Sequence, residues 1–330
     1  MSPQPLLKVE RLNISVRHRG SRRPLVHDVD LTVRAAESVG LVGESGSGKS
    51  MTIKAAMRLL PKNAVVEGAI EFEGRSVNEL GRRDLAQYRA RDVSLIHQDP
   101  RAHINPTRTI AQFITEGAVH TGVMSREAAL ERACVLMRDV GIEDAEKRLA
   151  QFPHQLSGGL LQRVMIVTAM LTSPRLIFAD EPTTALDVTV QSDVMAILLE
   201  QIQDHRVAML FVTHDLDLAA AVTDRLAVMY AGTVVETGTS DGICSRPLHP
   251  YTAALLRSRP STTEVRRPVT IPGSPLSAYE VTNGCSFAPR CSFAVDRCRG
   301  EVPHPRLVED RTVACHRAEE VVDLLQERAS

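Results

Sequence analysis

The sequence lacks a long apolar run and an excess of charge of either sign. Its longest apolar stretch, around residues 164–173, is far shorter than the roughly 20 residues that a membrane-spanning helix needs. The formal net charge is -1. These two absences exclude a chain that crosses a bilayer and remove any general electrostatic reason to bind nucleic acid.

A secretion signal is also lacking, because the start MSPQPLLKVE has no basic segment followed by an apolar core and a cleavage site. We therefore expect the chain to stay in the cytosol, where disulfides are disfavoured. Cysteine is scarce, with 6 in the whole chain. Four of them nevertheless fall close together near the end, which calls for another explanation than a disulfide framework.

Apolar strand patterns alternate with helical patterns, which predicts an α/β fold with a mainly parallel sheet. A strand is expected at 38–42, followed by a helix from Lys49 to Leu60. Further strands are expected at 175–180 and 207–213. At 330 residues, the chain is expected to have a main domain and a smaller second part.

Three further segments complete the predicted organisation. Residues 107–155 contain no strand pattern and are expected to form a helical insertion, with one helix capped by Ser125 and stopped at Gly141. Residues 225–238 predict a hairpin that turns near Ala231 and Gly232 and forms an antiparallel portion of the fold. After about Pro247, the many Pro, Ser and Gly residues predict a linker and a small appended region.

The segment GESGSGKS matches the phosphate-loop pattern G-x-x-x-x-G-K-[ST] between a predicted strand and a predicted helix. Gly46 and Gly48 allow the backbone to curl so that its N–H groups meet phosphate oxygens at a helix N-terminus. Lys49 adds a positive charge at the β- and γ-phosphates, and Ser50 offers a hydroxyl to Mg²⁺. The flanking strand and helix disfavour a merely flexible loop. The predicted phosphate-binding residues are Gly43, Glu44, Ser45, Gly46, Ser47, Gly48, Lys49 and Ser50.

Two carboxylates, Asp180 and Glu181, follow the apolar strand of RLIFADEP. Ligands of parallel sheets gather at the carboxyl ends of the strands. One carboxylate can hold Mg²⁺ while the other orients the attacking water of a phosphoryl transfer. Alone, such a pair is more often a solvated turn, but beside a phosphate loop it indicates the second half of a nucleotide site.

Three weaker signals narrow the class. Ser157 in LSGG precedes a helical run, as a cap would, and Gly158 and Gly159 leave that helix N-terminus open to a phosphate. Gln98 and His214 each end a predicted strand. Each signal alone is ordinary, whereas together and in this order they indicate an ATPase cassette.

Over residues 5–245 these motifs resemble the nucleotide-binding subunits of ABC transporters. The resemblance implies a head-to-tail dimer in which the phosphate loop of one chain and residues 157–159 of another enclose each ATP. It implies that Glu181 is the general base, that His214 contacts the γ-phosphate and that Gln98 links the nucleotide to the membrane subunits. The ATP-binding set then also includes Gln98, Asp180, Ser157, Gly158, Gly159 and Asp187 of the D-loop (with Ala185 and Leu186), and Mg²⁺ is assigned to Ser50, Gln98 and Asp180.

The segments QDPRAHINP, RPLHPYTAALL and GCSFAPRC look like those of the dipeptide/oligopeptide (and nickel) importer ATPases. This resemblance implies a nucleotide-binding domain at 1–245, with its helical subdomain at about 107–165, and a C-terminal extension at 246–330. It implies a peripheral position on the cytoplasmic face of the inner membrane. The implied partners are a second, related ATPase chain, two transmembrane permease subunits and an extracytoplasmic substrate-binding protein, with no nucleic acid.

In that family, the resemblance implies, the cysteines Cys285, Cys291, Cys298 and Cys315 bind a [4Fe-4S] cluster. From the residues alone, four thiolates suit an iron–sulfur cluster and tetrahedral zinc equally well. The gaps of five, six and sixteen residues fit neither the compact zinc spacings nor the ferredoxin runs, so the spacing does not choose, and zinc and free thiols stay as alternatives to the cluster. Cys134 is expected to be a buried apolar residue and Cys244 a bystander. His304 and His316 could replace a ligand, but histidines at such positions are more often surface residues.

Two positions depart from the family pattern. Val16 stands where the family has an aromatic residue that stacks on adenine, so that Arg17 or His18 is left for stacking. Leu160 replaces the Gln or Met that usually follows the signature glycines. The alternatives are import of nickel or another small solute, a soluble ABC ATPase of the repair or translation type, and a redox sensor. The second would predict a long coiled-coil insertion or a tandem cassette, and neither pattern is found.

Overall fold

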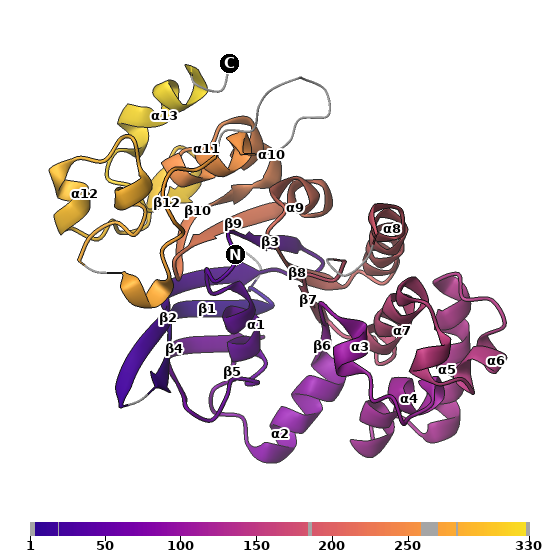
Figure 1. The fold of residues 1–330 in the computed structure, drawn as a ribbon. Coiled ribbons are helices and arrows are strands. Elements are labelled where there is room, and N and C mark those ends of the chain that lie inside the picture. The colour runs from indigo at the N-terminus through magenta and orange to yellow at the C-terminus, as the bar shows by residue number, and fades with distance from the viewer. Residues whose placement is uncertain (1–3, 19, 184–186, 259–269, 282, 328–330) are drawn as a thin grey trace. The chain divides into compact units, whose positions relative to one another are not determined.

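The computed structural model describes residues 4–18, 20–183, 187–258, 270–281 and 283–327 (Figure 1). The chain divides into two compact units. The first unit consists of Met1–Leu6, Val33–Glu37 and Phe72–Phe211, and the second of Leu7–Thr32, Ser38–Glu71 and Val212–Ser330.

The first unit contains a small group of strands and a larger group of helices. Its elements are β5 (Arg75–Ser76), α2 (Arg82–Gln87), η1 (Tyr88–Asp92), β6 (Val93–Ile96), α3 (Pro100–His103), α4 (Ile110–His120), α5 (Arg126–Asp139), α6 (Ala145–Leu149), η2 (Pro153–Gln155), α7 (Gly158–Met170), β7 (Leu176–Asp180), α8 (Val188–Asp204) and β8 (Ala208–Thr213), whose last two residues belong to the second unit.

Three strands of this unit lie in the order β8-β7-β6. β6 and β7 run parallel, with Val93 opposite Leu176 and Ile96 opposite Ala179. All of β8 and the first four residues of β7 are buried, which is typical of parallel strands covered on both faces. The predicted parallel strands are confirmed, and with them the α/β class.

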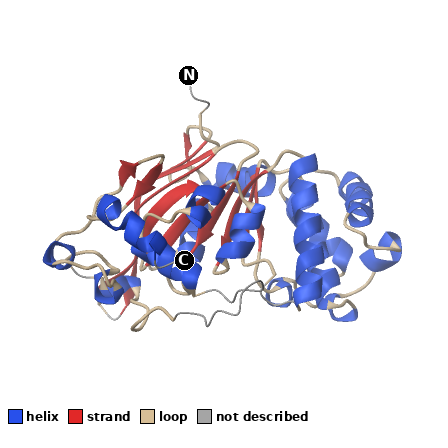
Figure 2. Cartoon of the chain, turned by 90° about the horizontal axis from the view of Figure 1, so that it is seen from above, coloured by secondary structure: helices blue, strands red, loops and turns tan. Residues whose placement is uncertain are grey.

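Residues 107–155 form helices without a strand, as the sequence predicts. Figure 2 shows a group of helices beside the strands. α7, which follows residues 107–155 in the chain, packs against α4 and α5. The Ser125 hydroxyl accepts a hydrogen bond from the N–H of Ala128, which confirms the predicted cap of α5. The prediction for Cys134 was wrong: Ala133 and Met137 face inward, and Cys134 is only half-buried.

The second unit contains two groups of strands, although the last residues of β2 and β4 belong to the first unit. Its elements are β1 (Leu7–His18), β2 (Ser21–Val33), β3 (Ser38–Val42), α1 (Lys49–Ala56), β4 (Ala64–Phe72), α9 (Leu216–Val222), β9 (Arg225–Tyr230), β10 (Thr233–Thr239), α10 (Ser240–Ser245), α11 (Pro250–Arg257), η3 (Ala278–Glu280), η4 (Ala288–Arg290), α12 (Asp296–Gly300), β11 (Arg306–Val308), β12 (Arg311–Val313) and α13 (Ala318–Glu327).

One group has the order β2-β1-β4 and the other β11-β12-β10-β9-β3. β3 and β9 pair in parallel, while β9 and β10 form the predicted antiparallel hairpin. Its two-residue turn consists of Ala231 and Gly232, with φ of 45° and 87°. Positive φ at both positions matches the twist of the two strands and confirms the predicted turn.

Two predictions for this unit were wrong in detail. α1 ends at Ala56 rather than at Leu60, because Arg58 adopts a left-handed φ of 52°. The linker predicted to begin after about Pro247 is helical at its start: His249 caps α11, whose first residue is Pro250. Residues 259–269 of the same stretch lie outside the described residues.

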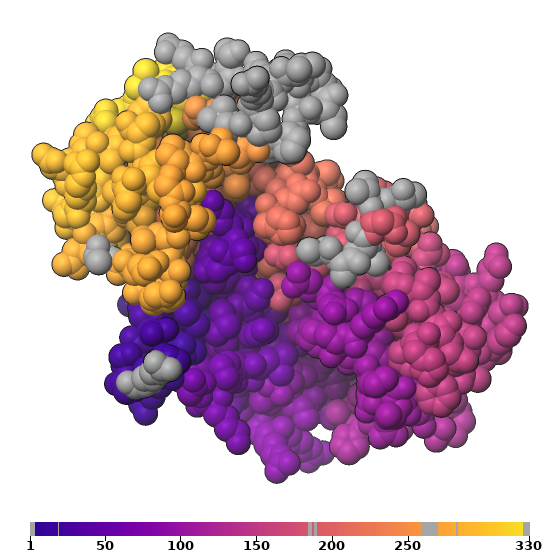
Figure 3. Space-filling model, viewed as in Figure 1, coloured from indigo at the N-terminus to yellow at the C-terminus, as the bar shows by residue number. Residues whose placement is uncertain are grey.

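The C-terminal residues also add to the strands and pack on β2. β12 pairs with β10, placing Val313 opposite Glu236. The imidazole Nε2 of His27 lies 2.8 Å from the carbonyl oxygen of Ala278, and the guanidinium of Arg23 lies 5.4 Å from the ring centre of Tyr279. In the space-filling view the orange C-terminal residues lie against the indigo first strands (Figure 3).

Candidate functional site

The phosphate-binding loop, residues 43–50, connects β3 to α1 within the second unit. Gly46 and Gly48 have φ of 80° and 105°, which L-residues rarely adopt. A Cβ on Gly43 would lie 2.0 Å from the carbonyl oxygen of Met229, so the strand end admits no side chain there. The loop therefore has the curled backbone that its glycines predict.

Lys49 and Ser47 supply polar groups in the interior of this loop. The Lys49 amine, 5% exposed, donates to the carbonyl oxygens of Gly43 and Glu44 at 2.7 and 3.0 Å. The hydroxyl of Ser47 is buried and has no hydrogen-bond partner among the described residues. An unpartnered buried hydroxyl and a buried ammonium suit an anionic ligand such as a phosphate chain.

Glu44, the second residue of the loop, is held from two sides by the C-terminal part of the second unit. Its N–H donates to the hydroxyl oxygen of Tyr251 at 3.0 Å. Its carboxylate accepts two hydrogen bonds from the guanidinium of Arg290, at 2.7 and 3.2 Å. Neither Tyr251 nor Arg290 follows from the sequence, because they lie 207 and 246 residues away from Glu44 along the chain.

The acidic end of β7 lies within the first unit. Asp180 ends the strand and is half-buried, and Glu181 follows with a left-handed φ of 48°. The Gln98 side-chain amide donates to a Glu181 carboxylate oxygen at 3.2 Å. Of the residues predicted from strand ends, Gln98 and Glu181 are thus brought together.

Ser157 is the N-cap of α7, and its hydroxyl accepts from the N–H of Leu160 at 3.3 Å. A Cβ on Gly159 would lie 2.7 Å from Cγ1 of Val190 in α8, so this glycine permits close packing of the two helices. Asp187 caps α8 by accepting from the N–H of Val190 at 3.1 Å. Ala185 and Leu186, also predicted for the D-loop, lie outside the described residues.

His214 follows β8 and is exposed, at the start of a turn in which the N–H of Asp215 donates to the Thr213 hydroxyl. Val16, at the predicted adenine position, is half-buried, while Arg17 and His18 are exposed. Stacking of either side chain on adenine stays a prediction.

The cysteines Cys285, Cys291, Cys298 and Cys315 line one cavity of about 20 Å³ in the second unit, together with Phe287 and Phe293. Burial raises the pKa of three of the thiols, those of Cys285, Cys291 and Cys315, to about 11. The N–H of Arg317 donates to the Cys315 sulfur at 3.4 Å. Among the described residues we find no group of three or more Cys, His, Asp or Glu that could hold a metal ion, so the metal site stays a prediction.

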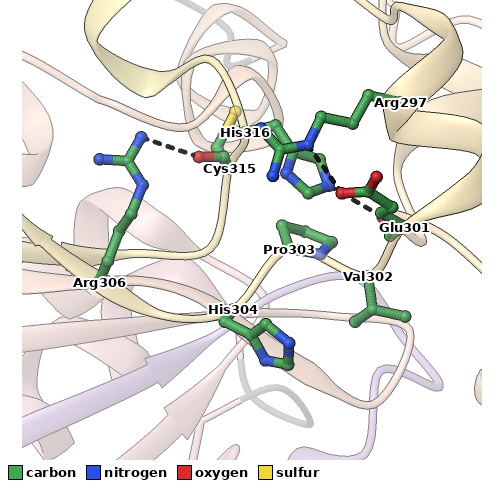
Figure 4. A pocket seen from close by; sticks show the side chains of 8 residues that line it. All are labelled: Arg297, Glu301, Val302, Pro303, His304, Arg306, Cys315 and His316. Atoms are coloured by element: carbon green, nitrogen blue, oxygen red, sulfur yellow. Dashed lines mark hydrogen bonds and ion pairs between the residues drawn. The ribbon is translucent and has the colours of Figure 1, made fainter.

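A second, more open hollow of about 420 Å³ lies beside Cys315 (Figure 4). His304 and His316 both line it. His316 bonds through Nε2 to the carbonyl oxygen of Glu301 at 2.9 Å, whereas the His304 ring points away from the Cys315 sulfur in Figure 4. Arg297 and Glu301, which also line the hollow, form an ion pair at 2.8 Å.

Comparisons with known proteins decide the family. Residues 26–184 match the family described as "ABC transporter", and residues 235–298 match the "Oligopeptide/dipeptide transporter, C-terminal region". The oligopeptide transport ATP-binding protein OppD of Salmonella typhimurium is 39% identical over 318 residues, which cover 95% of each chain. The dipeptide transport ATP-binding protein DppD of Escherichia coli is 40% identical and covers 94% of this chain and 96% of its own.

This chain belongs to the ABC transporter ATPases of the oligopeptide/dipeptide branch. A solved ATP-binding cassette, dimeric and bound to ADP and phosphate after hydrolysis, is 26% identical, with a TM-score of 0.60 over 71% of this chain and 98% of its own. No helix in the described part of the chain has the length and apolar character to cross a membrane. The predicted family and ATPase class are confirmed.

Proposed function

We propose that this ATPase powers the uptake of di- or oligopeptides across the cytoplasmic membrane. The observation that carries the proposal is that one chain joins a phosphate loop of ABC type to a C-terminal region of oligopeptide-transporter type. In this proposal residues 1–245 bind and hydrolyse ATP, and residues 246–330 form the branch-specific extension.

The phosphate chain of ATP would lie on the N–H groups of residues 43–50, with Lys49 neutralising its charge. Ser50, Asp180 and Gln98 would hold Mg²⁺, which neutralises charge that develops on the phosphates. The contact from Gln98 supports a role for Glu181 as the base that orients water, because it fixes the carboxylate in one place. His214 would contact the γ-phosphate.

Residues 157–159 and Asp187 would act on the ATP held by a second ATPase chain. The exposed Ser157 supports this role, since its hydroxyl sits at the N-terminus of the 13-residue α7. The further partners are two transmembrane permease subunits and an extracytoplasmic substrate-binding protein. The chain would bind the permease subunits as a peripheral subunit at the cytoplasmic face of the membrane, on the side opposite to the substrate-binding protein.

The test of the catalytic assignment is Glu181→Gln. Removing the base should lower ATP turnover by about a hundredfold or more, while ATP binding persists and the dimer accumulates in its ATP-bound form. Turnover and size-exclusion chromatography with ATP measure both effects. Normal turnover in this variant would exclude Glu181 as the base.

The substrate class is tested in the assembled transporter. We expect di- or oligopeptides, with the binding protein present, to stimulate ATP turnover. Lys49→Ala in the same assembly is the control, because it loses the charge that binds the phosphates. Stimulation by nickel or another small solute, with no response to peptides, would contradict peptide uptake and favour the alternative substrate.

We propose in addition that Cys285, Cys291, Cys298 and Cys315 hold a [4Fe-4S] cluster. Their all-sulfur set and shared cavity support such a site. Tetrahedral zinc on the same four sulfurs, with Zn–S bonds of about 2.3 Å, is the alternative. Bound iron would stabilise the thiolates that burial otherwise disfavours.

The measurement is metal and sulfide analysis of protein purified without oxygen. We expect iron and acid-labile sulfide, a brown absorbance, and loss of both in Cys291→Ser. Cys244→Ser is the matched control, since Cys244 is half-buried outside the cavity. Colourless wild-type protein that contains zinc would overturn the cluster assignment.

A further inference from the structure

The side chain of Arg290 is buried, with 5% exposed, and its polar contacts converge on the phosphate-binding loop. Besides its two hydrogen bonds to the Glu44 carboxylate, Nε donates to the carbonyl oxygen of Pro272 at 2.8 Å. One terminal nitrogen lies 3.4 Å from the Tyr230 hydroxyl oxygen. A guanidinium with this many hydrogen-bond partners has little freedom to move, so Arg290 fixes the position of the Glu44 carboxylate.

Aromatic rings keep this arrangement in place. Tyr230 and Tyr251 have ring centres 4.6 Å apart, and Phe287 lies 5.3 Å from both. The hydroxyl of Tyr251 receives the N–H of Glu44, so the same group of rings holds the backbone of the residue whose side chain Arg290 holds. All these residues belong to the second unit.

The charge of Glu44 makes the pair matter for nucleotide binding. A carboxylate in a phosphate-binding loop repels the phosphates of ATP, and the repulsion is strong where the site is partly shielded from water. Glu44 is such a group, with 22% of its side chain exposed. Arg290 neutralises it and turns it away into an ion pair.

We propose that Arg290 is a positioning residue for ATP binding, which acts by neutralising and orienting Glu44 in the phosphate-binding loop. The inference rests on the ATPase assignment but not on the transported substrate or on a metal in the cysteine cavity. It makes Arg290 a determinant of KM for ATP, with little influence on kcat.

The test is a double-mutant cycle in the assembled ATPase, read as KM and kcat for ATP. Arg290→Met should raise KM about tenfold, as expected for loss of hydrogen bonds to a charged group, with kcat within about twofold. Glu44→Gln removes the repulsion together with the pair, and its KM completes the cycle as the background in which Arg290→Met should have a smaller effect. The double variant should then bind ATP better than Arg290→Met alone.

The lower KM of the double variant distinguishes the proposal from a purely structural role, in which Glu44→Gln would raise KM further in the Arg290→Met background. Arg297→Met, which breaks the exposed pair with Glu301 in the same region, is the control and should leave KM unchanged. An unchanged KM in Arg290→Met, or a double variant as weak as Arg290→Met, would overturn the inference. If the wild-type assembly showed no ATP turnover, the ATPase assignment beneath the inference would have failed instead.

Folding of each variant is checked by thermal unfolding. Should Arg290→Met not fold, Arg290→Lys replaces it, because lysine keeps the positive charge but cannot donate the two parallel hydrogen bonds of the guanidinium. Arg290→Lys should raise KM about threefold, and this effect should vanish in the Glu44→Gln background. Persistence of the full effect in that background would contradict the proposal.

Discussion

Glu181 has a side chain suited to catalysis on a backbone conformation that non-glycine residues seldom adopt. Its φ of 48° costs roughly 1–2 kcal/mol relative to a right-handed conformation. The hydrogen bond from Gln98 holds the side chain that this conformation presents. Strain at the end of β7 thus coincides with the residue proposed as the base.

At the same scale, His249 predicts how stability depends on pH. Complete burial lowers its pKa to about 3, below the ordinary value of 6.5. Between about pH 6.5 and pH 3, His249 binds a proton in the unfolded chain but not in the folded chain. The contribution of neutral His249 to the free energy of unfolding is therefore complete above pH 6.5 and is lost as the pH falls toward 3.

We expect His249→Asn, which keeps an acceptor for the N–H of Tyr251, to lose less stability between pH 7 and about 5 than the wild type. Urea unfolding at several pH values measures the difference. An identical pH dependence of the two proteins would show that His249 is not the group responsible.

At the scale of elements, the hairpin turn between β9 and β10 contains one residue that glycine should improve and one glycine that should not be replaced. The positive φ of Ala231 is strained for a residue with a Cβ. A Cβ on Gly232 would lie 2.7 Å from the His27 ring and 3.0 Å from the Leu25 carbonyl oxygen. Ala231→Gly should raise the free energy of unfolding by up to about 1 kcal/mol, and Gly232→Ala should lower it by more. Chemical denaturation decides, and destabilisation by Ala231→Gly would contradict this reading of the turn.

The elements that the sequence predicts best are those defined by local patterns. The strands β3, β7 and β8, the hairpin and the cap of α5 all follow from apolar runs, turn residues and capping residues. β11 and β12 are three residues long, too short for an alternating pattern, and form where β12 meets β10. The phosphate-binding loop was predictable from its spacing, but Arg290 was not, because its partner lies far away in the chain.

At the scale of the whole molecule, a buried ion pair ties the C-terminal strands to β10. Glu236 has no exposed surface, and Arg311 of β12 lies 3.4 Å from its carboxylate. The same carboxylate accepts from the N–H groups of Leu248 and His249 ahead of α11. One acidic residue of the hairpin therefore organises both segments that follow it.

Arg311→Met should destabilise the protein by about 3–5 kcal/mol, since it leaves a buried carboxylate without its cation. Hydrogen exchange should show the loss first in β12 and α11. Arg306→Met, which breaks an exposed pair with Glu319, is the control, with an expected effect of about 1 kcal/mol or less. Equal effects of the two substitutions would contradict the distinction between the buried and the exposed pair.

The contact between Glu44 and Arg290 has a consequence for hybrid proteins. A chimera that receives residues 246–330 from another subunit inherits whatever that donor carries at position 290, while residue 44 stays with the host. A donor without the matching residue would leave an unpaired guanidinium or an unpaired carboxylate beside the phosphate-binding loop. C-terminal extensions of such ATPases are therefore interchangeable only when residues 44 and 290 are exchanged as a pair.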